Sequence, residues 1–250
     1  MRYSEADRKR RGKRRKKNYF RNISITVLVI LGLYFIGFHS GIFDVKTINV
    51  TNNVHYTAVQ VAEKTGVTMG ENIFLVRVSE VKYRLEQDPY IRLADVSWAL
   101  PDGLDIEIEE RKESVLIEYG DEYAIVDFDG VILRLTPEQL FLPIITGLTP
   151  IDPEPGLALK AEEAGQLKPA LDFIKYVEEQ DFYIKRLDLG RVIPRAYVFD
   201  RLIIEGDIQN MVKNIKEIKR IIADLDSKGI ERGTVSVGSG SCSFSPEIRD

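Results

Sequence analysis

The chain has 250 residues, of which 44% are hydrophobic and 30% are charged, an ordinary composition for a folded protein. Its net charge of −4 conceals a strong asymmetry, because residues 1–21 hold eleven Lys or Arg and only two acidic residues, whereas the remainder is acidic. The single cysteine, Cys242, excludes an intrachain disulfide, so packing alone must stabilise the fold.

A membrane span is predicted over residues 22–42. No Asp, Glu, Lys or Arg occurs from Asn22 to Phe43, and the stretch is rich in Ile, Val and Leu. A helix of about 20 apolar residues crosses the roughly 30 Å hydrocarbon layer of a bilayer. The basic tail over residues 1–21 is expected to stay in the cytoplasm and to fix the orientation, with the bulk of the chain beyond the inner membrane. The topology determinants are Arg10, Arg11, Lys13, Arg14, Arg15, Lys16 and Lys17.

Two alternatives to a membrane anchor exist for this N-terminal region. A cleaved signal peptide has a shorter apolar run and a cleavage site with small residues, and no such site follows here. A basic run also occurs in nucleic-acid-binding segments. Beside an apolar span it is more simply a topology signal, so no nucleic-acid partner is expected.

A first small domain is predicted over residues 43–112, with elements in the order β-α-α-β-β. Thr57 opens a capping-box pattern at the start of the first helix. The second helix is expected to be capped by Ser79 and to end before Pro89. Alternation of apolar and polar residues predicts the strands, which are expected at 45–50, 94–100 and 104–108.

A second, β-rich domain with helices is predicted over residues 113–238, which makes the fold class α+β. Strands are expected at 115–119, 123–126, 131–135, 184–189, 196–199, 202–205 and 234–237, with a short apolar run at 142–145. Helices are expected at 168–179 and, as one long element capped by Asp207, over 208–225. Residues 239–250 are expected to form a flexible C-terminal tail because Gly, Ser and Pro dominate them.

The first domain resembles the POTRA domain of the FtsQ/DivIB family of bacterial cell-division proteins. One departure is Asn52, where the family usually has Gly, but Asn also tolerates a left-handed turn. The layout of the second domain is similar to the β domain of that family, so the resemblance extends to about Val237. The residues that carry it are Phe43, Asp44, Val45, Ile48, Val50, Asn53, Gly66, Gly70, Asn72, Ile73, Phe74, Leu85, Asp88, Pro89, Tyr90, Ile91, Ala94, Val96, Leu100, Pro101, Leu104, Ile106, Glu110 and Arg111.

No constellation of residues indicates an enzyme. His39 and His55 have no Cys, Asp or Glu at a spacing typical of zinc sites. Cys242 has no nearby His to activate it, and the Gly-Ser run after Val237 lacks the features of a phosphate-binding loop. The prediction is therefore a protein without catalytic residues, metal or cofactor.

The resemblance implies a non-enzymatic scaffold of the divisome at the septum. It implies docking of small single-pass partners, FtsB (or DivIC) and FtsL, on the last strand of the β domain, at Thr234, Val235, Ser236, Val237 and Gly238. An open sheet edge offers unpaired N–H and C=O groups to such a partner. The first domain is expected to supply a second contact, to a DNA translocase or to the septal peptidoglycan synthase complex.

Two other functions compete with this interpretation. The first is a POTRA-type assembly or chaperone module, which usually has several POTRA copies in tandem. The second is a membrane-anchored cell-wall enzyme, which would need a clustered catalytic site.

Overall fold

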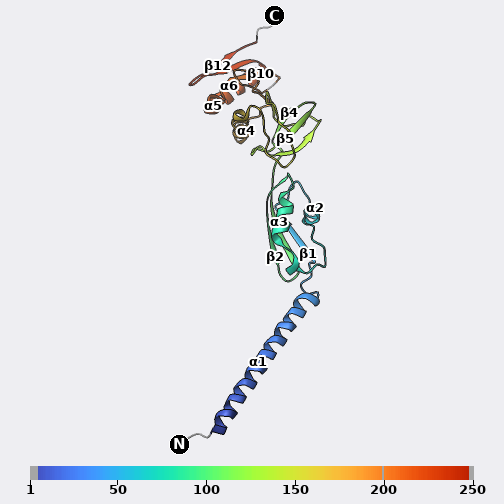
Figure 1. Cartoon of the computed structure of the whole chain (residues 1–250). Coiled ribbons are helices and arrows are strands. Elements are labelled where there is room, and N and C mark those ends of the chain that lie inside the picture. Colours follow the sequence, from blue (N-terminus) through green and yellow to red (C-terminus); the bar gives the residue numbers. More distant parts are fainter. Residues whose placement is uncertain (1–4, 199, 248–250) are drawn as a thin grey trace. The chain divides into compact units, whose positions relative to one another are not determined.

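The structure is a computed structural model that describes residues 5–198 and 200–247, with only the backbone described for residues 5–18, 20 and 164. The chain divides into two compact units, Met1–Leu85 with Leu93–Ile108, and Glu86–Arg92 with Glu109–Asp250 (Figure 1). Helices and strands occur in both units, which confirms the expected α+β class.

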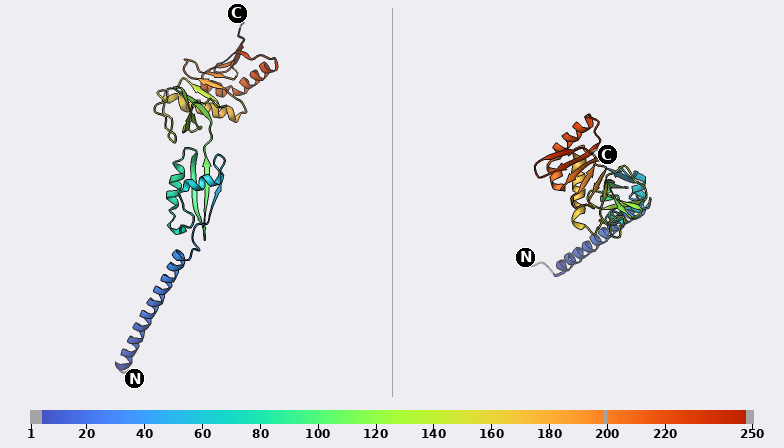
Figure 2. Two further views of the ribbon diagram at one scale, coloured as in Figure 1. Left: turned by 90° about the vertical axis from the view of Figure 1, so that its right-hand side faces the viewer. Right: turned by 90° about the horizontal axis from the view of Figure 1, so that it is seen from above.

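Helix α1 (Glu5–His39) is one uninterrupted rod, drawn in blue in Figure 2. Its stretch Arg21–His39 is long and apolar enough to cross a membrane, and its apolar side chains are exposed. The helix stops three residues before the expected end of the span at residue 42, because Gly41 adopts a left-handed φ of 67°. The seven expected topology determinants between Arg10 and Lys17 lie in α1, but their side chains are outside the described part.

The first unit contains a three-stranded sheet in the order β1-β3-β2. Strand β1 runs parallel to β3, with Thr47 opposite Gly103 and Thr51 opposite Glu107. The elements follow the expected β-α-α-β-β order, with one short 3-10 helix added between the two helices. They are β1 (Thr47–Thr51), α2 (Ala58–Thr65), η1 (Ile73–Leu75), α3 (Val78–Glu86), β2 (Ile91–Ala99) and β3 (Gly103–Glu110).

The ends of these helices follow local sequence chemistry. The Thr57 hydroxyl accepts a hydrogen bond from the Gln60 N–H, and the Gln60 side chain accepts one from the Thr57 N–H, so the expected capping box is present. Gly66 ends α2 with a left-handed φ of 68°. The expected cap at Ser79 is wrong, because α3 already begins at Val78.

The second unit contains a nine-stranded sheet in the order β12-β11-β10-β9-β8-β7-β4-β5-β6. Three helices accompany it: α4 (Ala164–Glu179), α5 (Ile208–Lys213) and α6 (Ile215–Ser227). The strands are β4 (Val115–Tyr119), β5 (Glu122–Val126), β6 (Ile132–Thr136), β7 (Ile144–Thr146), β8 (Arg186–Asp188), β9 (Arg195–Tyr197), β10 (Arg201–Gly206), β11 (Arg232–Val237) and β12 (Cys242–Ser245).

The main core of this unit lies between the three helices and one face of the sheet. Phe173 of α4 and Ile218 of α6 are among its fully buried members, together with inward residues of the strands such as Ile117. The opposite face carries no helix. At one end it has a small cluster around Leu116 and Ile125, against which Leu140 and Leu142 of the loop before β7 pack. We call this surface the helix-free face.

The expected long helix after Asp207 is interrupted. Asp207 caps α5 by accepting a hydrogen bond from the Gln209 N–H at 2.9 Å. At Asn214 the backbone leaves helical geometry, and the Asn214 side chain donates to the Asn210 carbonyl at 2.9 Å. Asn side chains that bond local backbone groups in this way compete with helix continuation, which explains the break between α5 and α6.

Candidate protein-binding site

Strand β11, expected to be an open edge, is paired on both sides. It runs parallel to β10 and antiparallel to β12, with Thr234 opposite Ser245 and Val237 opposite Cys242. Val235 and Val237 are buried in the core, whereas Thr234 is half-buried, and Ser236 and Gly238 are exposed. The expectation of an edge at Thr234–Gly238 is therefore wrong, and the sheet ends at β12 instead.

Strand β12 is the element that sequence reasoning missed. Its residues were expected to belong to a flexible tail, yet the Gly238 N–H donates to the Ser241 carbonyl at 3.0 Å and closes a tight turn at Ser239 and Gly240. After the turn, half-buried Cys242 and Phe244 alternate with exposed Ser243 and Ser245. This alternation and the Gly-Ser turn residues are hairpin signals that were available in the sequence.

The open edge of β12 presents the backbone groups of Cys242 and Phe244. Facing residues of an antiparallel pair alternate between hydrogen-bonded and non-hydrogen-bonded positions. Since Gly238 and Ser241 are hydrogen-bonded, the next facing pairs place the ladder bonds of β12 at Ser243 and Ser245. The N–H and C=O groups of Cys242 and Phe244 therefore point away from β11, toward a position that a further strand would occupy.

The opposite edge of the sheet differs from this one. Strand β6 is covered by the loop at residues 150–161, in which the Leu157 carbonyl accepts from the Ile132 N–H at 2.9 Å and the Gly156 N–H donates to the Ile132 carbonyl at 2.7 Å. Within residues 200–247, no comparable loop bond covers the outward groups of β12. Because one edge is covered and the other is open, a further strand can pair with the sheet only at β12.

The helix-free face beside β12 is polar. Thr234 and Ser236 of β11 lie next to Ser245 and Ser243 of β12 on this face. Two strands further in, Arg195 forms an ion pair of 3.1 Å with Glu205. The buried Nε of Arg195 has no hydrogen-bond acceptor among the described residues. A partner carboxylate or carbonyl that reached this nitrogen would satisfy it.

The chemistry of this region does not resemble a catalytic centre. Burial, together with the nearby charge of Glu217, raises the pKa of the Cys242 thiol above its ordinary value, which disfavours the reactive thiolate. In the described part of the chain, no group of three or more His, Cys, Asp or Glu is placed to hold a metal ion. The arrangement is suited to pairing with another protein through backbone hydrogen bonds.

Comparisons with known proteins agree with this architecture. A family model described as "POTRA domain, FtsQ-type" matches residues 43–111. The cell division protein DivIB of Clostridium acetobutylicum is 27% identical over 200 residues, which cover 75% of this chain and 78% of that protein. DivIB of Bacillus subtilis is 25% identical over 229 residues, covering 89% and 82%. The cell division protein FtsQ of Corynebacterium glutamicum is 24% identical over 178 residues, covering 68% and 79%.

The fold and the family model define a class of protein: an apolar N-terminal helix, one FtsQ-type POTRA domain and a β-rich unit. The relatives extend the similarity well beyond the POTRA domain. These comparisons support the FtsQ/DivIB family of cell-division proteins and a role in cell division.

Proposed function

We propose that this chain is a non-enzymatic scaffold of the divisome that recruits or stabilises other membrane-anchored division proteins at the septum. The open edge of β12 is the observation that carries this proposal, because it offers backbone groups for pairing beside a polar, helix-free face. The similarity to cell-division proteins supports a role of this edge in the division complex.

The partners we propose are FtsB/DivIC-like and FtsL-like single-pass proteins. A strand of the partner would pair with Cys242 and Phe244 of β12, and its side chains on the helix-free face would lie next to Ser243 and Ser245. Thr234 and Ser236 lie one strand further in. Anchoring of both proteins in one membrane raises their effective concentration, so that a short strand contact is sufficient. The septal peptidoglycan synthase complex is a further proposed partner of the assembled scaffold.

The proposed topology places the N-terminus in the cytoplasm and residues 43–250 beyond the inner membrane. The exposed apolar stretch Arg21–His39 supports one span. The basic residues 1–21 support the orientation, because Lys and Arg flanking a span are retained on the cytoplasmic side.

Proline at Cys242 is expected to weaken partner binding without unfolding the sheet. The substitution removes an N–H that faces the open edge, and the ring obstructs an approaching strand, whereas proline is tolerated on edge strands. One hydrogen bond contributes about 1 kcal/mol, so with the steric effect we expect a loss of at least about tenfold in affinity. Titration calorimetry with a separately purified FtsB/DivIC-like partner measures the affinity and tests this.

The matched control for Cys242→Pro is Cys242→Ala, which also loses the thiol but keeps the edge N–H. It should bind the partner as the parent chain does. Equal affinities of the folded proline and alanine variants would show that β12 is not the docking edge.

Protease added to intact spheroplasts is expected to degrade residues 43–250 because the proposed topology exposes them. Immunoblots with one tag at each end of the chain measure this, and the N-terminal tag should survive on a short fragment. If the C-terminal tag survived on the full chain while a periplasmic control protein was degraded, the proposed topology would be wrong.

A further inference from the structure

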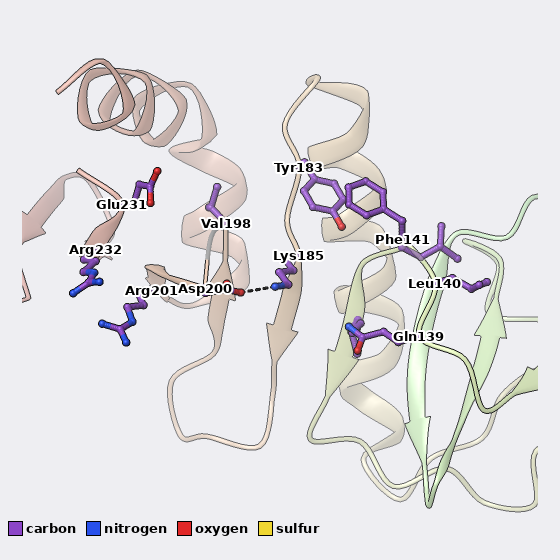
Figure 3. A pocket seen from close by; sticks show the side chains of 12 residues that line it. Gln139, Leu140, Phe141, Tyr183, Lys185, Val198, Asp200, Arg201, Glu231 and Arg232 are labelled. Atoms are coloured by element: carbon purple, nitrogen blue, oxygen red, sulfur yellow. Dashed lines mark hydrogen bonds and ion pairs between the residues drawn. The ribbon is translucent and has the colours of Figure 1, made fainter. Parts of the chain in front are cut away.

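A groove lies at the end of the second unit's sheet where strands β7, β8, β10 and β11 begin. It has a volume of about 620 Å³ and extends from the loop before β7 to the first residues of β10 and β11 (Figure 3). The aromatic and charged side chains discussed below that line it are Phe141, Tyr183, Lys185, Asp200, Arg201 and Arg232. The proposed edge-strand docking does not use any of them.

One end of the groove is formed by an exposed aromatic pair. Phe141 and Tyr183 stack with ring centroids 5.4 Å apart and planes inclined by 4°, and Phe141 is 90% exposed. A second cavity of about 440 Å³ adjoins the same pair, with the apolar side chains of Leu142, Ile174 and Phe182 among its lining. Aromatic side chains next to an apolar cavity provide a pocket in which a partner's apolar side chain loses contact with water.

The other end of the groove is basic. Arg201 and Arg232 face each other in register on the parallel strands β10 and β11, and both are exposed. Strand alternation places both on the helix-free face, where Figure 3 shows them side by side. Like charges opposite each other destabilise a sheet. Among the described residues, no carboxylate forms an ion pair with either guanidinium.

The carboxylates nearest to these arginines form no ion pair with them among the described residues. Asp200 forms its ion pair with Lys185, and this contact lowers the pKa of the Asp200 carboxyl. Glu231 is drawn separately from both guanidinium groups in Figure 3, with no interaction marked between them. The groove therefore keeps two arginines available for an anion supplied from outside.

We propose that this groove binds an acidic segment of a partner protein, with an apolar side chain at Phe141 and Tyr183 and carboxylates at Arg201 and Arg232. Strands β11 and β7 are four positions apart in the sheet, which corresponds to about 19 Å at about 4.8 Å per strand. An extended segment of about six residues, at about 3.3 Å each, spans that distance. The apolar cavity at one end favours a peptide over an anionic polysaccharide.

The test uses the full chain in nanodiscs and a fluorescein-labelled hexapeptide, Phe-Gly-Ser-Gly-Asp-Glu, with binding followed by fluorescence anisotropy. The double variant Arg201→Glu with Arg232→Glu should bind at least about tenfold more weakly, because two charge-assisted contacts become repulsive. Phe141→Ala should also weaken binding. A peptide ending in Lys-Lys should bind the double variant better than it binds the parent chain.

The matched control is Lys216→Glu with Arg220→Glu, the same charge change at exposed positions of α6. It should leave peptide affinity within about twofold. Circular dichroism checks that every variant is folded. Equal binding of the peptide to the parent chain and the folded Arg201/Arg232 variant would overturn the proposal. Binding of hyaluronate instead of the peptide would also overturn it, because the ligand would then be a polysaccharide. Conversion of a self-associated chain to monomers by the Arg201/Arg232 variant would overturn it as well, because the groove would then bind a second copy of this chain.

Discussion

Gly147→Ala is expected to destabilise the second unit by about 4 kcal/mol or more, at the upper end of effects for single substitutions. Gly147 has a φ of 81°, which L-residues adopt at a cost of about 1–2 kcal/mol. A Cβ at this position would also lie 2.0 Å from the Gly190 nitrogen and 2.5 Å from its Cα. These are backbone atoms at the end of the neighbouring strand, so no side-chain rotation relieves the clash.

The clash would separate the ends of β7 and β8, where the Leu189 N–H donates to the Thr146 carbonyl at 2.9 Å. Gly120→Ala is the control, because Gly120 also has a positive φ, 59°, but a Cβ there meets nothing within 4 Å. Urea-dependent hydrogen exchange, followed by mass spectrometry of second-unit peptides, compares the two. If both variants lost the same stability, the close backbone approach at Gly147 would not be the cause.

Asp127→Ala is expected to destabilise the second unit by about 3–4 kcal/mol. The Asp127 carboxylate is 8% exposed and lies 2.6 Å from the Arg111 guanidinium, which is 17% exposed. It also accepts hydrogen bonds from the N–H groups of Asp129 and Val131, at 3.0 and 2.8 Å, in the turn between β5 and β6. Alanine removes all three interactions and leaves the half-buried charge of Arg111 with less compensation.

Two companion variants separate these contributions. Asp127→Asn keeps an acceptor for the turn but loses the charge, so its effect should be intermediate. Asp129→Ala removes a carboxylate that is 48% exposed and 3.5 Å from Arg111, and should cost no more than about 1 kcal/mol. The same exchange measurement applies. A loss for Asp129→Ala as large as that for Asp127→Ala would contradict the assigned order of importance.

Local signals in the sequence were sufficient for most of the secondary structure. The capping box at Thr57 and the alternation over β3 each depend on neighbouring residues, and both are present as expected. The two hydrophobic side chains of β11, Val235 and Val237, are core residues.

Some of what the sequence did not reveal depends on contacts between distant segments. The break at Asn214 involves not only the local Asn210 carbonyl but also the carbonyl of Gly238, which is 24 residues away. The edge of the sheet was misplaced by one strand because the Gly-Ser composition before Cys242 was taken for a tail. The groove at Arg201 and Arg232 requires the register of β10 with β11, which no pattern within either strand specifies.

Residue-resolved hydrogen exchange of the full chain, with and without a co-purified FtsB/DivIC-like partner, tests the central claim most directly. Open-edge amides exchange readily, whereas amides paired with a partner strand are protected. The account predicts new protection at the N–H groups of Cys242 and Phe244, while Ser243 and Ser245 are already protected by β11. Binding of the partner with no change at Cys242 and Phe244 would contradict the claim that β12 is the edge on which it docks.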